Sequence, residues 1–324
     1  MKHKQNGKNA RKITLQKIIR GNVTGQMRRN IIEHLWRNYS TSTAHVKKIE
    51  AKLTIKNISL PQLDHLAIID LPGPHTGIPQ LRNLFDAIGY VFQGADYLPD
   101  KQNDFTWMAA PESHGTPANQ ALPQVVIADF RLDELPSTVS DIVLKYSKQA
   151  SALPIEKIKE LAASTDPEAA TALLHLVTTY LSGRDWPLPT VKEFQIVRAH
   201  NELLAWVLIF GRRPNHFSYA IHLMPDFASL TDFHRFIETE VNLPLNQDGG
   251  AIKGSQATGI EQGSTAGTPE NISLADGSIE LPTGFIEFVW RYTDKKQPVL
   301  WNDYYTGFIA SHANRVIQSL YVHD

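Results

Sequence analysis

The stretch Leu63-Asp64-His65-Leu66-Ala67-Ile68-Ile69-Asp70 is short and mostly apolar, and the turn sequence Leu71-Pro72-Gly73-Pro74 follows it. This combination predicts a β-strand that ends at a turn. A helix is predicted over about residues 79–88, and Gly89 ends it. Further strands are predicted over residues 90–93, 105–109 and 125–130. The order of elements from residue 63 is therefore βαβββ.

The same kind of order begins again after a long helical segment. Helices are predicted over about residues 137–150, 155–163, 165–183 and 193–210. They are followed by a strand over 216–224, a helix opening at 229–232, a Gly-rich loop over 249–267, a strand over 284–292 and a helix over about 311–321. We therefore expect an α+β fold in which two β-rich halves surround one site, with helices inserted between them.

Charge is distributed unevenly along the 324 residues, although the formal net charge is -1. The first 30 residues hold nine of the 32 basic side chains and no acidic one, so the remaining 23 stand against 33 acidic residues. We predict a basic N-terminal extension over residues 1–30 and a single catalytic domain over residues 31–324. The helical insert occupies about residues 137–210 of that domain.

Composition excludes several classes of protein. The chain has no Cys, which rules out disulfides, a thiol nucleophile, an iron–sulfur cluster and Cys-ligated zinc. The longest apolar run, residues 203–210, is far shorter than the roughly 20 residues that span a bilayer. We expect a cytoplasmic protein without a membrane span. Nucleic acid is not an expected partner, because no aromatic residues are interleaved with the basic ones in residues 1–30.

Strand alternation selects three side chains that could share a metal. His65, His216 and Glu287 each lie within an apolar strand, and a carboxylate there is costly to bury unless it meets a cation. Two His and one Glu form the 2-His-1-carboxylate set typical of non-haem iron sites. The alternative is that each His is a hydrogen-bonded core residue. His222 shares the face of His216 but lies about 20 Å further along the strand, so it is not expected to be a ligand.

Four stretches together resemble the 2-oxoadipate dioxygenase/decarboxylase family: residues 63–67, 200–217, 252–255 and 284–291. The likeness extends from about residue 30 to the end of the chain, and the block from His200 to Phe217 is its most specific part. It implies a vicinal-oxygen-chelate-like β core, related to hydroxymandelate synthase. It also implies Fe(II) bound by two His and one Glu, and the matching positions are His65, His216 and Glu287.

The resemblance further implies a reaction. A 2-oxo dicarboxylic acid similar to 2-oxoadipate would react with O2, lose CO2 and become a shortened 2-hydroxy acid. The partners are thus the small 2-oxo acid and O2, and the cofactor is Fe(II). For 2-oxoadipate the product would be 2-hydroxyglutarate, in a step of lysine breakdown.

One position departs from the family pattern. Members usually carry an Arg four residues after the first metal-binding His, where it holds the far carboxylate of the substrate, and this chain has Ile69 there. Arg291 and Lys253 are the candidate replacement cations, although Arg291 could equally be a strand-end surface charge and Lys253 a solvated loop residue. Ala310 and Ser311 align with residues that contact the substrate through their backbone.

Two alternative functions stay open from the sequence. A metal-dependent isomerase or lyase on the same core would be consistent with the missing Arg. The body could also be an inactive relative that acts as a binding protein, docking an acidic partner through the basic residues 1–30. Residues 200–202 are either outer partners of a ligand His or polar residues of a helix surface.

Overall fold

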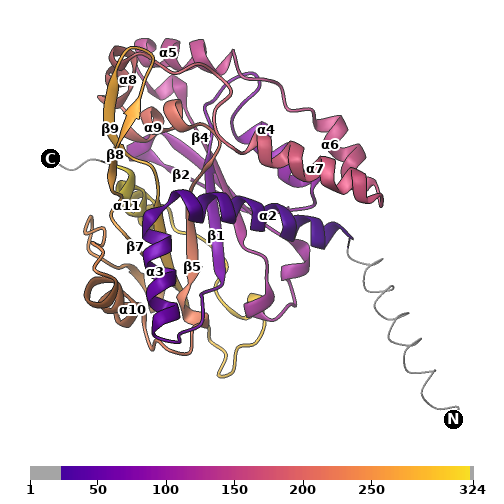
Figure 1. Cartoon of the computed structure of the whole chain (residues 1–324), viewed down its shortest axis with the longest axis vertical. Coiled ribbons are helices and arrows are strands. Elements are labelled where there is room, and N and C mark those ends of the chain that lie inside the picture. Colours follow the sequence, from indigo (N-terminus) through magenta and orange to yellow (C-terminus); the bar gives the residue numbers. More distant parts are fainter. Residues whose placement is uncertain (1–22, 322–324) are drawn as a thin grey trace, which may run out of the picture.

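A single curved sheet forms the centre of the protein, whose computed structural model describes residues 23–321 (Figure 1). Its eight strands follow the order β2-β3-β4-β1-β5-β10-β7-β6. Their bounds are β1 Leu63–Ile69, β2 Val91–Leu98, β3 Asn103–Ala109, β4 Gln124–Phe130, β5 Pro214–Ala220, β6 Lys253–Ser255, β7 Ile260–Ser264 and β10 Phe285–Arg291. A separate hairpin comprises β8 Pro269–Ser273 and β9 Ser278–Pro282.

The sheet consists of two equivalent halves. In the first, β1 pairs in parallel with β4, and β3 and β2 follow in antiparallel pairing. In the second, β5 pairs in parallel with β10, and β7 and β6 follow in antiparallel pairing. An antiparallel pairing of β1 with β5 joins the halves. Both halves start with a strand, a helix and then further strands, which confirms the predicted arrangement.

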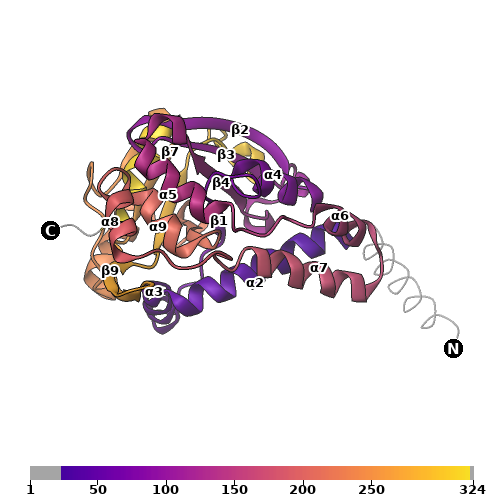
Figure 2. The same cartoon turned by 90° about the horizontal axis from the view of Figure 1, so that it is seen from above.

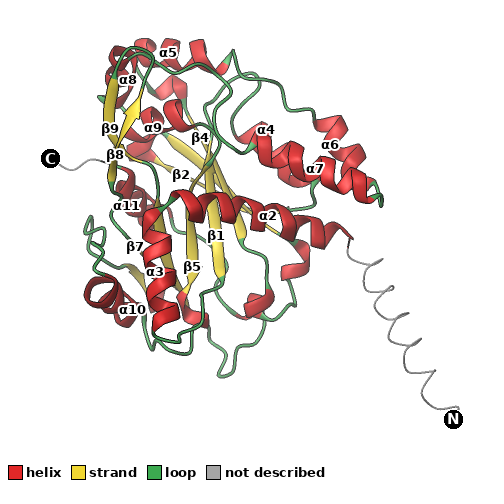
Figure 3. Cartoon of the chain, viewed as in Figure 1, coloured by secondary structure: helices red, strands yellow, loops and turns green. Residues whose placement is uncertain are grey.

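Helices cover both faces of the sheet (Figures 1 and 3). Strand alternation divides β1, so that Leu66 and Ile68 belong to one apolar cluster and Ile69 to the other. The first cluster includes residues of α2 Val23–Ser42, α3 Ala44–Ile55, α4 Ile78–Ala87, α6 Ile155–Ala163, α7 Pro167–Tyr180 and α10 Leu230–Phe236. The second includes residues of α5 Ser137–Ser147, α8 Val191–Arg198, α9 Glu202–Phe210 and α11 Ala310–Val316. Seen from above, β2 arches over the side opposite α2 (Figure 2).

Two predicted segments contain other elements than the ones predicted for them. The predicted helix over 193–210 is two helices, because Asn201 adopts an extended backbone and its side chain accepts a hydrogen bond from the Leu204 N–H as the cap of α9. The predicted loop over 249–267 contains β6 and β7. These strands are short and each contains one Gly, so strand periodicity does not identify them.

The N-terminal region joins the domain earlier than predicted. Residues 23–30, which were assigned to the extension, lie in α2. Arg28 is buried there, forms an ion pair with Glu112 and donates a hydrogen bond to the Ile88 carbonyl. The other basic residues of the predicted extension, apart from Arg29, lie outside the described residues. Among residues 23–321, no helix is long and apolar enough to cross a membrane.

We expect the contribution of His45 and His234 to the free energy of unfolding to fall as the pH drops from about 6.5 toward 4. Burial, followed by a nearby lysine, lowers the pKa of both His45 and His234 from 6.5 to about 4. Their folded pKa lies below the unfolded value, so stability is complete above pH 6.5 and decreases as the unfolded chain gains protons. Each contributes up to about 1.4 kcal/mol per pH unit. Urea denaturation of the parent and of a His45→Gln/His234→Leu variant at pH 7 and pH 5 isolates this contribution. The parent should lose more stability than the variant between the two pH values, and an equal change in both proteins would contradict the prediction.

Candidate metal centre

The three residues selected by strand alternation meet on neighbouring strands at the middle of the sheet. His65 lies on β1, His216 on β5 and Glu287 on β10, and all three are buried. The Nε2 atoms of His65 and His216 each lie 3.0 Å from Oε2 of Glu287. One ligand atom from each residue falls within 4.8 Å of the others. The structure therefore brings together the whole predicted set.

The symmetry of the halves explains why there are three such residues rather than four. In the strand register, Val126 on β4 lies relative to His65 as Glu287 on β10 lies relative to His216. Val126 lines the cavity beside the three residues but offers no donor atom. The protein therefore supplies ligands from one side and leaves the Val126 side open.

The orientation of His65 is fixed through its other ring nitrogen. Nδ1 lies 2.8 Å from Oδ1 of Asp64 and 2.7 Å from Oγ of Ser218. A proton on Nδ1 is donated to the Asp64 carboxylate, which directs Nε2 at Glu287 as the nitrogen that would bind a metal. This is the usual arrangement of a metal-binding His whose second nitrogen is held by a carboxylate.

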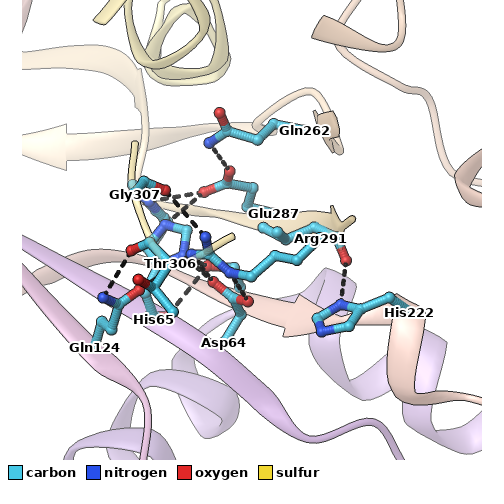
Figure 4. A network of polar contacts seen from close by, with 12 residues as sticks. Asp64, His65, Gln124, His222, Gln262, Glu287, Arg291, Thr306 and Gly307 are labelled. Atoms are coloured by element: carbon cyan, nitrogen blue, oxygen red, sulfur yellow. Dashed lines mark hydrogen bonds and ion pairs between the residues drawn. The ribbon is translucent and has the colours of Figure 1, made fainter. Parts of the chain in front are cut away.

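Arg291 holds the carboxylate of Asp64 in place (Figure 4). Its Nε and one terminal nitrogen donate to the two oxygens of Asp64 at 2.7 and 2.8 Å. The remaining donors reach the carbonyls of Tyr305 and Gly307 and the amide oxygen of Gln124. All five N–H groups of the guanidinium are thus used within the protein. This pairing argues against the predicted substrate contact of Arg291 and gives it a positioning role.

Glu287 is held in a comparable way. The side-chain amide of Gln262 donates to Oε1 of Glu287 at 2.7 Å, while Oε2 faces the two imidazoles (Figure 4). Burial alone would raise the pKa of Glu287, but the neighbouring His65 and His216 outweigh it and hold the pKa well below its usual range. Glu287 is therefore a carboxylate at neutral pH.

The donor set fits a divalent transition metal. Burial opposes protonation of His65, but the Glu287 and Asp64 carboxylates outweigh it and raise the pKa of His65 to about 9. The surroundings thus favour positive charge at the point where the three ligand atoms converge. Two imidazoles and a carboxylate, held by outer hydrogen bonds, are ligands suited to Fe(II). His65, His216 and Glu287 would hold the ion.

The other predicted contact residues do not belong to the described wall of the cavity beside the triad. Lys253 is buried on β6 and donates from Nζ to the Asn246 carbonyl at 3.0 Å. Burial lowers the pKa of Lys253 to about 8. Ala310 and Ser311 form the first turn of α11, whereas the cavity wall receives Ala313 and Val316 from this helix.

Two further histidines of the sequence lie away from the ligand atoms. His222 is in a 3-10 turn after β5, and its ring packs edge-on against Tyr304. His200 is exposed between α8 and α9. Its neighbours Asn201 and Glu202 serve as a helix cap and as the partner of Arg198, so these residues belong to helix ends and surfaces.

The sequence also matches known proteins. A family model for 2-oxoadipate dioxygenase/decarboxylase matches residues 28–294. The chain belongs to the 2-oxoadipate dioxygenase/decarboxylase family. The family resemblance of the sequence is thereby confirmed. A curated relative is the chloroplastic/amyloplastic 2-oxoadipate dioxygenase/decarboxylase of Oryza sativa, 27% identical over 268 residues, which are 79% of this chain and 68% of the relative.

Solved structures confirm the α+β, vicinal-oxygen-chelate-like fold expected for a 2-oxoadipate dioxygenase/decarboxylase family member. Hydroxyglutarate synthase from Oryza sativa, solved in complex with 2-oxoadipate, aligns with a TM-score of 0.74 at 24% identity and covers 92% of each chain. A glyoxalase superfamily protein from Ralstonia eutropha aligns with a TM-score of 0.72 at 12% identity and covers 85% of each chain. At these identities the two structures establish the fold.

Proposed function

We propose that this chain is an Fe(II)-dependent dioxygenase that decarboxylates a small 2-oxo acid and hydroxylates the shortened product. The observation that carries the proposal is the buried triad of His65, His216 and Glu287 at a cavity, in a chain of this family. Three protein ligands on one side leave positions for a chelating 2-oxo acid and for O2. 2-Oxoadipate, which the family name states, is the reference substrate.

The proposed reaction balances without a second organic substrate. 2-Oxoadipate and O2 give 2-hydroxyglutarate and CO2. The bond between C1 and C2 breaks, and C1 leaves as CO2. One oxygen atom enters the new carboxylate and the other enters the new hydroxyl group of the same molecule. Bound Fe(II) would supply the redox chemistry that O2 requires.

The side chains around the triad have complementary tasks in this proposal. Asp64 and Ser218 hold His65 with Nε2 toward the site, and Gln262 holds Glu287. Phe308 packs edge-on against the His65 ring at 4.8 Å between centroids and also lines the cavity. Its ring shields the reacting atoms from bulk water, which protects reactive species formed there.

An oxygen electrode tests the proposal with protein reconstituted anaerobically with Fe(II). A panel of 2-oxo acids is added with O2, and CO2 is collected in parallel. We expect at least one acid to cause equimolar O2 uptake and CO2 release. Substrate conversion without O2 uptake would contradict the proposal and indicate an isomerase or lyase. The cytoplasmic location and a place in lysine breakdown stay predictions.

A further inference from the structure

The cavity beside the triad is polar at one end and apolar at the other. Its volume is about 60 Å³. In the strand register, Ile69 on β1 lies beside Ala128 on β4, and Ala128 lies beside Phe105 on β3. Ile69 shares the face of His65 and lies about 13 Å further along the strand. Apart from the amide of Asn103, which donates to the Asp129 carbonyl, the far wall is built from apolar side chains that cannot pair with charge.

More apolar side chains close this far end. Leu98 comes from the end of β2 and Leu203 from helix α9, whose residues 203–209 are all buried. Val316 and Ile317 come from the end of α11 and the turn after it. Among the described residues that line the cavity, the triad is the one source of charge. A ligand group at the far end thus exchanges water for hydrocarbon.

Arg291 and Lys253, the two predicted replacement cations, do not supply a charge to the far end of the cavity. Arg291 uses its donors on Asp64, two backbone carbonyls and an amide. Lys253 donates to the Asn246 carbonyl and does not belong to the described cavity wall. A second carboxylate beside Ile69 would lose its hydration and gain no cationic partner, which is strongly unfavourable.

A buried amide without a hydrogen-bond partner lies beside His216 in the chain. Asn215 directly precedes His216, is fully buried and forms part of the cavity wall. The pairing of β1 with β5 shifts register here, because Ala67 is opposite His216 and Ile68 is opposite Pro214. Within the described part of the chain, neither Oδ1 nor Nδ2 of Asn215 has a hydrogen-bond partner. A buried amide without partners is costly unless a ligand supplies them.

We propose that the substrate of this chain is a 2-oxo monocarboxylic acid with an apolar tail. Its oxo acid group lies at the triad and Asn215, and its hydrocarbon tail packs against Ile69 and Phe105. This inference rests on the proposed function and restricts its substrate class. It replaces the expected dicarboxylic acid by an acid of similar length that ends in a methyl group.

Anaerobic calorimetry tests the inference without turnover. 2-Oxohexanoate and 2-oxoadipate have equal numbers of carbon atoms and differ in the far end, methyl or carboxylate. We expect Fe(II)-loaded protein to bind 2-oxohexanoate at least tenfold more tightly. Equal or tighter binding of 2-oxoadipate, or no binding of either acid, would overturn the inference. Absent O2 uptake despite this affinity order would instead overturn the proposed function alone.

Variants connect the preference to particular side chains. Ile69→Arg should reverse the order of the two affinities, whereas Ile69→Met, which keeps an apolar side chain of similar size, should preserve it. Asn215→Leu should weaken binding of both acids by about tenfold and leave their order unchanged, because it removes the contact to the group they share. Unchanged affinity in Asn215→Leu, or an unchanged order in Ile69→Arg, would contradict the assigned contacts.

Discussion

His216→Ala should bind Fe(II) at least about 100-fold more weakly and lose O2-dependent turnover of any 2-oxo acid. The loss of an outer partner of a metal ligand already costs about 10–100-fold in affinity, and this variant removes a ligand itself. His216 is one of the three residues whose donor atoms converge. Metal titration followed by O2 uptake measures both effects on the same sample.

His222→Ala is the matched control for this loss. His222 follows on the same segment of chain and is largely shielded from solvent, but its ring contacts Tyr304 and the Val289 carbonyl rather than the triad. This variant should bind Fe(II) as the parent does, and circular dichroism should show both variants folded. Full O2 uptake by a folded His216→Ala protein would remove the triad from the mechanism.

Arg291→Leu should lower the free energy of unfolding by about 3–5 kcal/mol, because it leaves the Asp64 carboxylate buried without its charged partner. Arg291 and Asp64 are almost entirely excluded from solvent, with exposed fractions of 1% and 0%. Fe(II) affinity should fall as well, by about 10–100-fold, because Asp64 loses the partner that keeps it in position to hold His65. Urea denaturation and metal titration measure the two losses.

Arg131→Leu provides a matched comparison on the surface. Arg131 also forms two hydrogen bonds with the two oxygens of an aspartate, Asp104, but both side chains are more than one-third exposed. An exposed pair of this kind contributes little to stability, so this variant should change the free energy of unfolding far less than Arg291→Leu does. If Arg291 bound the substrate instead, Arg291→Leu would weaken substrate binding and leave stability and metal affinity near the parental values.

Local sequence signals selected the three residues that the structure brings together, but not the residues that hold them in place. His65, His216 and Glu287 stand out because a polar residue in an apolar strand requires a partner. Asp64 carries the same signal in the same strand, and its neighbour His65 and the distant Arg291 are its partners. Which residues become partners depends on the pairing of strands far apart in the chain. That pairing is a property of the sheet and has no local sequence pattern.

The two-half architecture was predictable for a related reason. Strand and helix signals repeat in the order βα on both sides of the helical insert, and the sheet joins the halves through β1 and β5. The break before α9 was missed because Asn201 interrupts an otherwise continuous helical pattern and acts as a cap. The N-terminal boundary was missed because Arg28 appears as one more basic residue, whereas its guanidinium is buried against Glu112.

Reaction with ¹⁸O-labelled O2 tests the central claim most directly. Fe(II)-loaded protein is supplied with the 2-oxo acid that it binds most tightly, and the product is examined by mass spectrometry. The account predicts a 2-hydroxy acid one carbon shorter that carries two labelled oxygen atoms, one in its carboxylate and one in its hydroxyl group. A product without label, formed while the metal occupies the triad, would contradict it.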